Sequence, residues 1–237
     1  MAKAPLAGEV KTRLVPPLTA PEAAALNVCF LRDMAENIET VSEEGVVVYT
    51  PTGSEAAFAG VLPEGFKLLA QRGAHLGERL CNATEDLLQQ GYGAVCLINS
   101  DSPTLPASIL LRAVEALARD GDRVVLGAAE DGGYYLIGLK HAHRNLFNEI
   151  AWSTSDVFAR TTQRAAEIDL PVELLPPWYD VDDAETLDRL CEELFASSRL
   201  NEAYPAPHTR AFLKAIIESE GPGRIWPRTN TDEHGQN

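Results

Sequence analysis

The chain has 237 residues, of which 45% are hydrophobic and 23% charged, and its 20 Lys and Arg against 35 Asp and Glu give a net charge of −15. So acidic a chain repels nucleic acid and anionic membranes, which excludes both as electrostatic partners. No apolar run reaches the roughly 20 residues of a membrane span. The four cysteines lie far apart, which suits reduced thiols, and we therefore expect a cytoplasmic protein without disulfides.

The first predicted element is a helix that opens with the capping box Thr19-x-x-Glu22. Its apolar stripe consists of Leu26, Phe30, Met34, Ile38 and Val41. Buried strands are expected over 46–49 and 67–70, followed by a helix over 76–89. The continuous apolar run over 94–98 is typical of a strand in a parallel sheet that is covered on both faces.

The second half of the chain continues this alternation. Helices are expected over 106–119, after Ser155, after Asp183 and over 205–219, and strands over 123–126, 134–139 and 172–175. The pattern predicts an α/β fold with a Rossmann-like, mostly parallel sheet and helices on both faces. We expect one domain over 1–220 and a polar, disordered tail over 221–237. Ligands of such folds bind at the carboxyl ends of the strands.

The segment from Lys3 to Leu14 is a basic loop in an acidic chain. Its three cations are Lys3, Lys11 and Arg13, set among small residues. Free backbone amides in such a loop cradle phosphate oxygens while the cations neutralise them. The alternative is a solvated N-terminal tail whose positive charge is accidental. No G-x-G-x-x-G follows a strand and no Walker motif is complete, so nicotinamide or flavin binding has no support.

Two acidic segments follow predicted strands and are candidates for metal binding. Asp101 comes directly after the most apolar strand, where a carboxylate can hold Mg²⁺ or Mn²⁺ against phosphates; the alternative is an N-cap or Asx turn. Asp180 and Asp182 are two residues apart, hence on one side of an extended segment. They are candidates for the second half of a metal site, with Asp183 as the cap of the next helix. The alternative is that all three aspartates serve only in helix capping and solvation.

The segment Glu130-Asp131-Gly132-Gly133 has two acids followed by two glycines. Such a tight turn can bring a carboxylate and backbone amides close to a substrate. The alternative is a simple hairpin turn, which the same residues also form.

Taken together, these segments resemble a bacterial family of nucleotide-diphospho-sugar transferases with a glycosyltransferase-A-like fold, of the type associated with radical-SAM proteins or arsenosugar biosynthesis. The matching pieces, in order over residues 2 to about 190, are KAPLAGEVKTRL, RGAHLGERL, NSDSPTLP, AEDGGYYLIGL, AWSTSDV and YDVDDAETLDRL. The fold of this family is similar to that of guanylyltransferases acting on phospholactate and molybdopterin.

The resemblance implies roles for individual residues. It implies that Asp101 holds the divalent ion with Asp180 or Asp182. The nucleotide side would comprise Lys3, Ala7, Gly8, Lys11, Arg13, Gln71, Gly77 and Asp101, with Gln71 and Gly77 lining the base and ribose pocket. The acceptor side would comprise Glu130, Asp131, Gly132, Gly133, Trp152, Ser153 and Thr154.

The expected activity is metal-dependent transfer of a sugar from a nucleotide-sugar to a small acceptor, with Asp101, Lys11 and Arg13 at the phosphates and Glu130 or Asp131 as base. The single acid of Ser-Asp-Ser-Pro, in place of D-x-D, leaves nucleotidyl transfer from a nucleoside triphosphate as the alternative. A non-catalytic nucleotide-binding module is a third possibility.

The resemblance also bears on the first strand. Family members usually have an apolar strand ahead of the Lys-Ala-Pro segment, whereas Met1 here falls inside that region. We therefore expect either a short central strand or a start site placed too far downstream.

Overall fold

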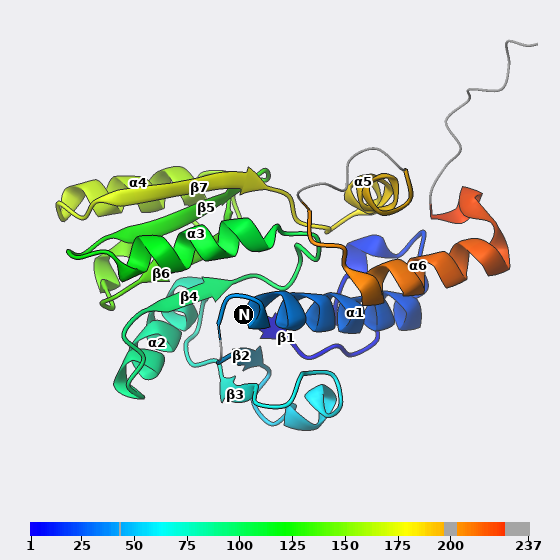
Figure 1. The fold of residues 1–237 in the computed structure, drawn as a ribbon, viewed down its shortest axis with the longest axis horizontal. Helices are drawn as coiled ribbons and strands as arrows, with labels where there is room; N and C mark the ends of the chain where they lie inside the picture. The colour runs from blue at the N-terminus through cyan, green and yellow to red at the C-terminus, as the bar shows by residue number, and fades with distance from the viewer. Residues whose placement is uncertain (43, 197–202, 226–237) are drawn as a thin grey trace, which may run out of the picture.

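A computed structural model describes residues 1–42, 44–196 and 203–225. The first half of the chain forms β1 (Ala2–Lys3), α1 (Ala20–Glu39), β2 (Val46–Thr50), β3 (Lys67–Ala70), α2 (Leu76–Gln89), β4 (Val95–Ile98) and α3 (Ala107–Ala118). The second half forms β5 (Val124–Ala129), β6 (Tyr134–Leu139), α4 (Val157–Glu167), β7 (Val172–Trp178), α5 (Ala184–Phe195) and α6 (Pro207–Glu220) (Figure 1). Short 3₁₀ helices are η1 (Thr12–Leu14), η2 (Glu55–Phe58), η3 (Arg144–Phe147) and η4 (Pro222–Arg224).

The strands form two sheets that meet at the start of the chain. One has the order β1-β2-β3 and is parallel throughout, and the other has the order β4-β6-β5-β7. Strand β6 is antiparallel to both neighbours, while β5 and β7 are parallel. The Met1 ammonium joins the two sheets by donating to the Ile98 carbonyl at 2.7 Å. The mostly parallel sheet is confirmed, with β6 reversed because a short turn links it to β5.

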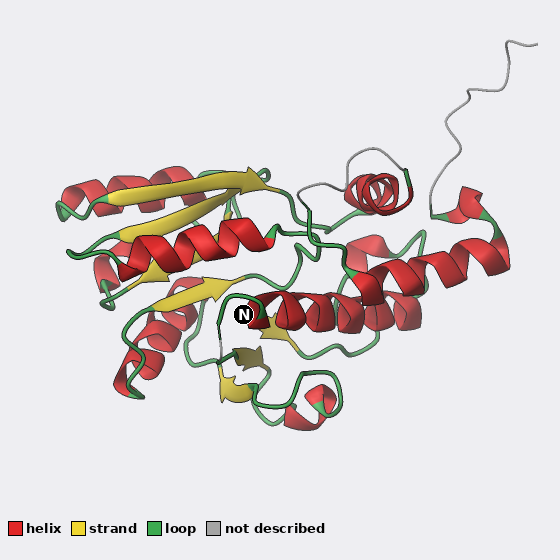
Figure 2. Ribbon diagram, in the orientation of Figure 1, coloured by secondary structure: helices red, strands yellow, loops and turns green. Residues whose placement is uncertain are grey.

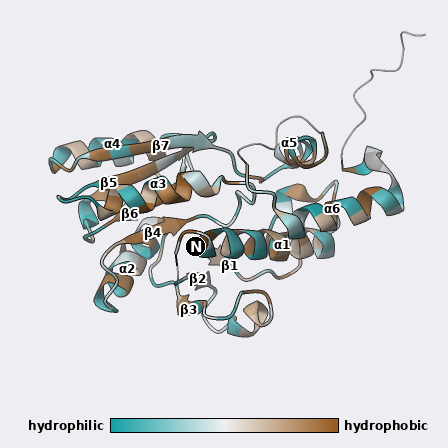
Figure 3. Ribbon diagram, in the orientation of Figure 1, coloured by the Kyte–Doolittle hydropathy of each residue, from teal (hydrophilic) through white to brown (hydrophobic). Residues whose placement is uncertain are grey.

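Helices cover both faces of the sheets, as predicted (Figure 2). On one face a buried cluster joins α2, η3 and α4 to β4, β5 and β6. On the other face α1 and α3 pack against β5, β6 and β7. Figure 3 shows hydrophobic residues concentrated along β4, β5 and α3, where these two clusters lie. Among the described residues, no helix combines the length and apolarity that crossing a membrane requires.

Several helices begin or end at the residues that local sequence signals predict. Helix α1 begins with the predicted capping box, in which the Glu22 carboxylate accepts from the Thr19 N–H at 2.7 Å. Helix α2 has the predicted bounds, and Asp183 is the N-cap of α5. Strand β7 runs beyond the predicted end at residue 175 and includes Pro176 and Pro177. Proline is tolerated there because β7 is an edge strand, which has a free side for residues that lack an N–H.

A third cluster packs α1 against α5 and α6 beside the sheets. It includes Ile225, which is fully buried, and the Arg224 guanidinium pairs with Glu22 and Glu220. These contacts place Arg224 and Ile225, which belong to the segment expected to be a disordered tail, against the body of the protein. The rest of that segment, 226–237, lies outside the described residues.

Asp33 ties α1 to the start of α6. Its carboxylate is fully buried and accepts from the backbone N–H groups of His208 and Thr209 at 2.9 and 2.8 Å. Replacing Asp33 with alanine is expected to lower the free energy of unfolding by about 3 kcal/mol, because two buried donors lose a charged acceptor. Urea unfolding measures this, with Glu36→Ala as the control. Equal stability of the two variants would contradict the assignment.

Candidate functional site

The basic loop and the acidic segments meet at the carboxyl ends of β1, β4 and β7. Lys11 is the N-cap of η1 and has a left-handed backbone, with φ of 48°. Its ammonium lies 2.5 Å from the Asp101 carboxylate and 3.1 Å from that of Asp182, and donates to the Val181 carbonyl at 2.8 Å. The three segments that contribute these groups are far apart in the sequence. The fold therefore brings together the cation and carboxylates that the sequence singled out.

The Lys11 ammonium is shielded from solvent, since its side chain is only 4% exposed and lies over the Phe30 ring, with 5.3 Å between the nitrogen and the ring centroid. Arg13 differs, because its side chain is 68% exposed while it donates to Asp182 at 2.8 Å. The alternative of a solvated tail is wrong for Lys11, which is a buried bridge between two loops. Arg13 remains accessible to a ligand.

Asp180 is held inside the site. One of its oxygens, Oδ1, accepts from the Asn99 amide and the Ser102 hydroxyl, each at 2.6 Å. Burial raises the pKa of Asp180 to about 6, the two hydrogen bonds oppose this rise, and the nearby charges of Asp101 and Asp182 add to it. Asp101 does not cap α3, whose N-cap is Pro106, so the capping alternative for Asp101 is wrong.

The three aspartates do not all converge on one point. Among the described residues, two groups have ligand atoms of three residues within 4.8 Å of one another, and both lie elsewhere: Asp122 with His141 and His143, and Asp33 with Glu36 and His208. Asp101 and Asp182 both contact the Lys11 ammonium, whereas the Oδ1 atom of Asp180 accepts hydrogen bonds from Asn99 and Ser102. Asp101 and Asp182 are thus the better pair for a cation between them.

The Glu130–Gly133 segment forms the hairpin turn between β5 and β6. The Asp131 carboxylate accepts from the Gly133 N–H at 2.8 Å, and Gly132 has φ of 90°. A Cβ on Gly132 would lie 2.1 Å from the Ser155 carbonyl oxygen, so only glycine fits this turn. Both oxygens of Glu130 bind the Arg189 guanidinium, at 2.6 and 3.1 Å. Arg189 in turn stacks on the Tyr179 ring, 3.8 Å from its centroid.

Two of the predicted nucleotide-binding residues, Gln71 and Gly77, are engaged in contacts within the protein. The Gln71 amide donates to the carbonyls of Ala2 and Val48 at 3.3 and 2.9 Å, which makes it a tie between β1 and β2. Gly77 is buried in the first turn of α2, where a Cβ would lie 2.6 Å from the Trp152 indole. The predicted donor and acceptor segments are therefore in contact at this point. Ser153, next to Trp152, is exposed with φ of 65°.

The tip of the basic loop is open. Ala7 and Gly8 are exposed, and no atom lies within 4 Å of the position a Gly8 Cβ would take. Gly8 has φ of 80°, a conformation that glycine adopts without strain. The Lys3 ammonium donates to the Glu9 carbonyl within the same loop, at 2.8 Å.

Several residues that shape the site had no role in the sequence reasoning. Asn99 and Ser102 orient Asp180, and Asn99 also accepts from the Asp101 N–H at 3.3 Å. Both lie in the Asn-Ser-Asp-Ser segment, so a polar run directly after an apolar strand was the signal for them. Phe30 was predicted only as part of the apolar stripe of its helix, and no local signal pointed to its contact with Lys11 or to Arg189, because the partners of both are distant in the sequence.

The chain is similar in structure to proteins that have been solved before. A protein of Desulfovibrio desulfuricans G20, provisionally named a nucleotide-diphospho-sugar transferase, has a crystal structure that is similar to this chain with a TM-score of 0.80 and 31% identity. The match covers 92% of this chain and 93% of that one. The structure of CMP:2-keto-3-deoxy-manno-octonic acid synthetase complexed with CTP is similar in fold, with a TM-score of 0.52, 12% identity and coverage of 80% and 93%.

No curated protein matches the sequence significantly. The family model described as "Uncharacterized protein conserved in bacteria (DUF2064)" matches residues 34–154. This range includes α2, Asp101 and the Glu130–Gly133 turn, and the match to the Desulfovibrio protein extends over the flanking loops as well. The chain therefore belongs to the bacterial DUF2064 family.

Proposed function

We propose that the protein is a divalent-metal-dependent transferase that uses a nucleotide-activated donor, and that it moves a sugar from a nucleotide-sugar to a small acceptor. The observation that carries the proposal is the meeting of Lys11 with Asp101 and Asp182 at the carboxyl ends of the strands. The overall similarity to the protein named a nucleotide-diphospho-sugar transferase supports it. The narrower assignment to radical-SAM-associated or arsenosugar-type enzymes rests on the sequence resemblance alone.

The donor set suits Mg²⁺ or Mn²⁺. Asp101 and Asp182 offer hard oxygen ligands close to one point, and Mg²⁺ commonly takes one or two carboxylates together with substrate phosphates. When bound, the ion would stabilise the negative charge on the departing diphosphate. Three carboxylates against Lys11 and Arg13 leave the site net negative, so a diphosphate needs this added charge in order to bind.

The chain's own groups would divide the remaining work. In the metal-free protein the Lys11 ammonium holds Asp101 and Asp182; it would leave this point to the ion and turn, with the exposed Arg13 guanidinium, towards the phosphate oxygens. Asp131 is the better candidate for the acceptor base, because it is exposed whereas both oxygens of Glu130 are bound by Arg189. Gly132 and Gly133 would let the acceptor approach the backbone of the turn closely.

Nucleotidyl transfer is the second candidate. It is favoured by the single carboxylate of Ser100-Asp101-Ser102, where many sugar transferases have two. In that reaction the donor is a nucleoside triphosphate, attack is at the α-phosphorus, and pyrophosphate leaves.

A thermal-shift panel of nucleoside triphosphates and nucleotide-sugars, with and without Mg²⁺ or Mn²⁺, tests the proposal. Binding to the folded state raises the melting temperature by mass action. We expect one class of nucleotide to raise the melting temperature only when metal is present. Indifference to every nucleotide in the presence of metal would refute both enzyme candidates.

Product analysis then separates the remaining options. Release of a nucleoside diphosphate supports sugar transfer, and release of pyrophosphate supports nucleotidyl transfer. Nucleotide affinity without turnover, retained in Asp101→Ala, would indicate a non-catalytic binding module.

A further inference from the structure

Two histidines and an aspartate meet where β5 begins and β6 ends. Asp122 comes shortly before β5, and His141 and His143 follow shortly after β6. We call these three residues the histidine cluster. The two strands pair with Val124 opposite Leu139, and this register brings the start of β5 beside the end of β6. The pairing of the strands therefore places three side chains of metal-ligating type together.

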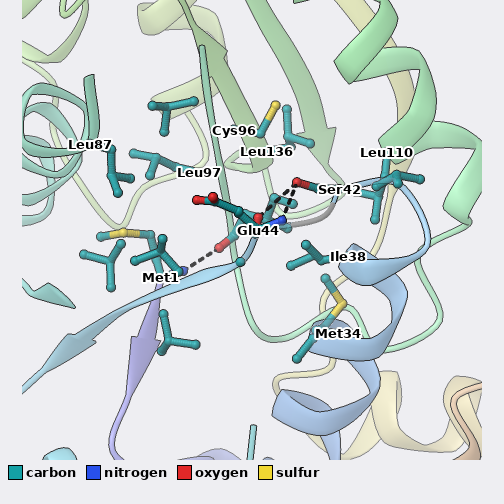
Figure 4. Close-up of a pocket in the computed structure, with 18 of the residues that line it drawn as sticks. Met1, Met34, Ile38, Ser42, Glu44, Leu87, Cys96, Leu97, Leu110 and Leu136 are labelled. Atoms are coloured by element: carbon teal, nitrogen blue, oxygen red, sulfur yellow. Dashed lines mark hydrogen bonds between the residues drawn. The ribbon is translucent and has the colours of Figure 1, made fainter. Parts of the chain in front are cut away.

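The histidine cluster lies far from the proposed transferase site. Strand β7 runs towards α5 (Figure 1), and β5 is parallel to β7. The start of β5 is thus at the opposite end of the sheet from Lys11, Asp101 and Asp182, which we call the Lys11 cluster. The histidine cluster is also separate from an apolar cavity of about 730 Å³ between β2 and β4, which Met34 and Leu97 help to line (Figure 4). An ion at the histidine cluster would therefore bind independently of both places.

The two imidazole rings face different oxygens of one carboxylate. The Nδ1 atom of His141 lies 3.2 Å from Oδ1 of Asp122, and the Nε2 atom of His143 lies 2.7 Å from Oδ2. One ligand atom from each of the three residues lies within 4.8 Å of the other two. Ligand atoms around a tetrahedral Zn²⁺ are about 3.3 Å apart, because the bonds to the ion are about 2.0 Å long. The three side chains therefore need only a small adjustment to surround one ion.

Hydrogen bonds hold the histidine cluster in this arrangement. The Asp122 carboxylate accepts from the N–H of the next residue at 3.0 Å, and the His143 N–H donates to the His141 carbonyl at 3.0 Å. The Lys140 ammonium donates to the Gly121 carbonyl at 2.9 Å, which ties the chain after β6 to the turn that carries the aspartate. Because these loops are already fixed, an ion that binds here orders little additional chain.

A second group with a similar composition is less suitable for an ion. It consists of Asp33, Glu36 and His208. Both oxygens of Asp33 accept backbone N–H groups at the start of α6, so this carboxylate already serves in holding the helix. The histidine cluster has no such task in helix capping and is the better metal site of the two.

We propose that the histidine cluster is a binding site for Zn²⁺, with three protein ligands and a water molecule in the fourth position. Imidazole nitrogens suit zinc and related transition metals, whereas Mg²⁺ takes oxygen ligands, so this site and the Lys11 cluster select different ions. The ion takes the place of the proton between each imidazole and the carboxylate, and in a neutral imidazole the ring proton then occupies the other nitrogen. The side chain of His141 is 69% exposed, which gives the ion a path from solvent and leaves room for the water.

A bound ion would cross-link two connections of the fold. Asp122 belongs to the connection between α3 and β5, and both histidines belong to the connection between β6 and η3. Zn²⁺ would therefore stabilise this end of the sheet, since a ligand that binds the folded state shifts the unfolding equilibrium by mass action. At a zinc concentration about 100 times the dissociation constant, we expect the melting temperature to rise by about 5 °C.

Titration of the full chain with Zn²⁺ tests this proposal. The affinity is measured at neutral pH by competition with a chromophoric zinc chelator, with millimolar Mg²⁺ present to occupy sites made of carboxylates alone. We expect one Zn²⁺ per chain with a dissociation constant of about 10 µM or lower. His141→Ala and Asp122→Asn should each weaken binding at least about 100-fold, the upper end of the loss seen when a residue that supports a metal ligand is removed.

Nuclear magnetic resonance of the wild-type chain gives a second readout that does not depend on how the variants fold. Zinc should shift the ¹⁵N resonances of the two ring nitrogens that face the carboxylate, Nδ1 of His141 and Nε2 of His143. Saturation of these shifts should follow the same dissociation constant as the chelator competition.

His75→Ala is the matched control, because His75 is an exposed histidine that lies 3.7 Å from a single carboxylate, that of Glu78. This variant and Asp101→Asn should both keep the wild-type zinc affinity within about twofold, since neither residue is near the histidine cluster. Zinc affinity that is unchanged in Asp122→Asn and His141→Ala would overturn the proposal, as would a wild-type chain that binds zinc more weakly than expected. Neither readout involves nucleotide or turnover, so failure here leaves the proposed transferase function separately testable.

Discussion

Replacing Asp101 with asparagine is expected to lower the transferase rate by about 1,000-fold, because the amide cannot supply the charge that holds a divalent cation against the donor phosphates. The substitution keeps the size of the side chain and the backbone bond from the Val181 N–H to the Asp101 carbonyl. The rate is measured with Mg²⁺ and the donor that the thermal-shift panel identifies. Circular dichroism confirms that the variant is folded.

Glu173→Gln is the matched control for this loss. Glu173 is a carboxylate on β7 that pairs with Arg119 and is 40% exposed, away from the Lys11 cluster. Its amide variant should retain the wild-type rate within about twofold, since surface ion pairs contribute little. An Asp101→Asn protein with wild-type activity would remove Asp101 from the proposed metal site.

Replacing Lys11 with methionine is expected to lower the free energy of unfolding by about 2 kcal/mol at neutral pH without divalent metal. Methionine keeps the apolar stem against Phe30 but leaves Asp101 and Asp182 facing each other without the shared ammonium. Because the carboxylates are each a third exposed, water limits the loss. Millimolar Mg²⁺ or Mn²⁺ should restore stability, since the ion takes a place between the same oxygens.

Arg13→Met provides the comparison for Lys11→Met. Arg13 bonds to the same Asp182 carboxylate, but its exposed side chain gives an expected loss below about 0.5 kcal/mol. Urea unfolding of both variants, with and without metal, gives the four values required. If metal raised the stability of wild type and Lys11→Met equally, Lys11 would not stand where the cation binds.

The elements that follow from local sequence were predicted well, because their causes are local. The capping box at Thr19 and the helical pattern over 76–89 depend on neighbours within a turn or two, and α1 and α2 begin as expected. Strand β5 continues through Gly127 to Ala129, beyond the predicted end, because it is held between β6 and β7. Weak strand formers are stabilised there by pairing that no local pattern contains.

The residues of the site could be predicted from the sequence, but the contacts between these residues could not. The sequence identified Lys11, Asp101 and Asp182 as chemically suitable, but their distances to one another depend on three loops meeting. The pairing of Glu130 with Arg189 also joins distant segments, and it changes which acid of the turn is available as a base. Ion pairs between remote elements leave no periodic or spacing signal in a single sequence.

The contact of Gly77 with Trp152 limits how this family can diversify. The Trp152 indole occupies the space that any side chain at position 77 would need, as the 2.6 Å approach of a Cβ shows. A larger residue at position 77 would therefore have to appear together with a smaller one at position 152. Among homologues, these two positions should covary, and evolutionary changes on the acceptor side would be constrained by the first turn of the helix on the donor side.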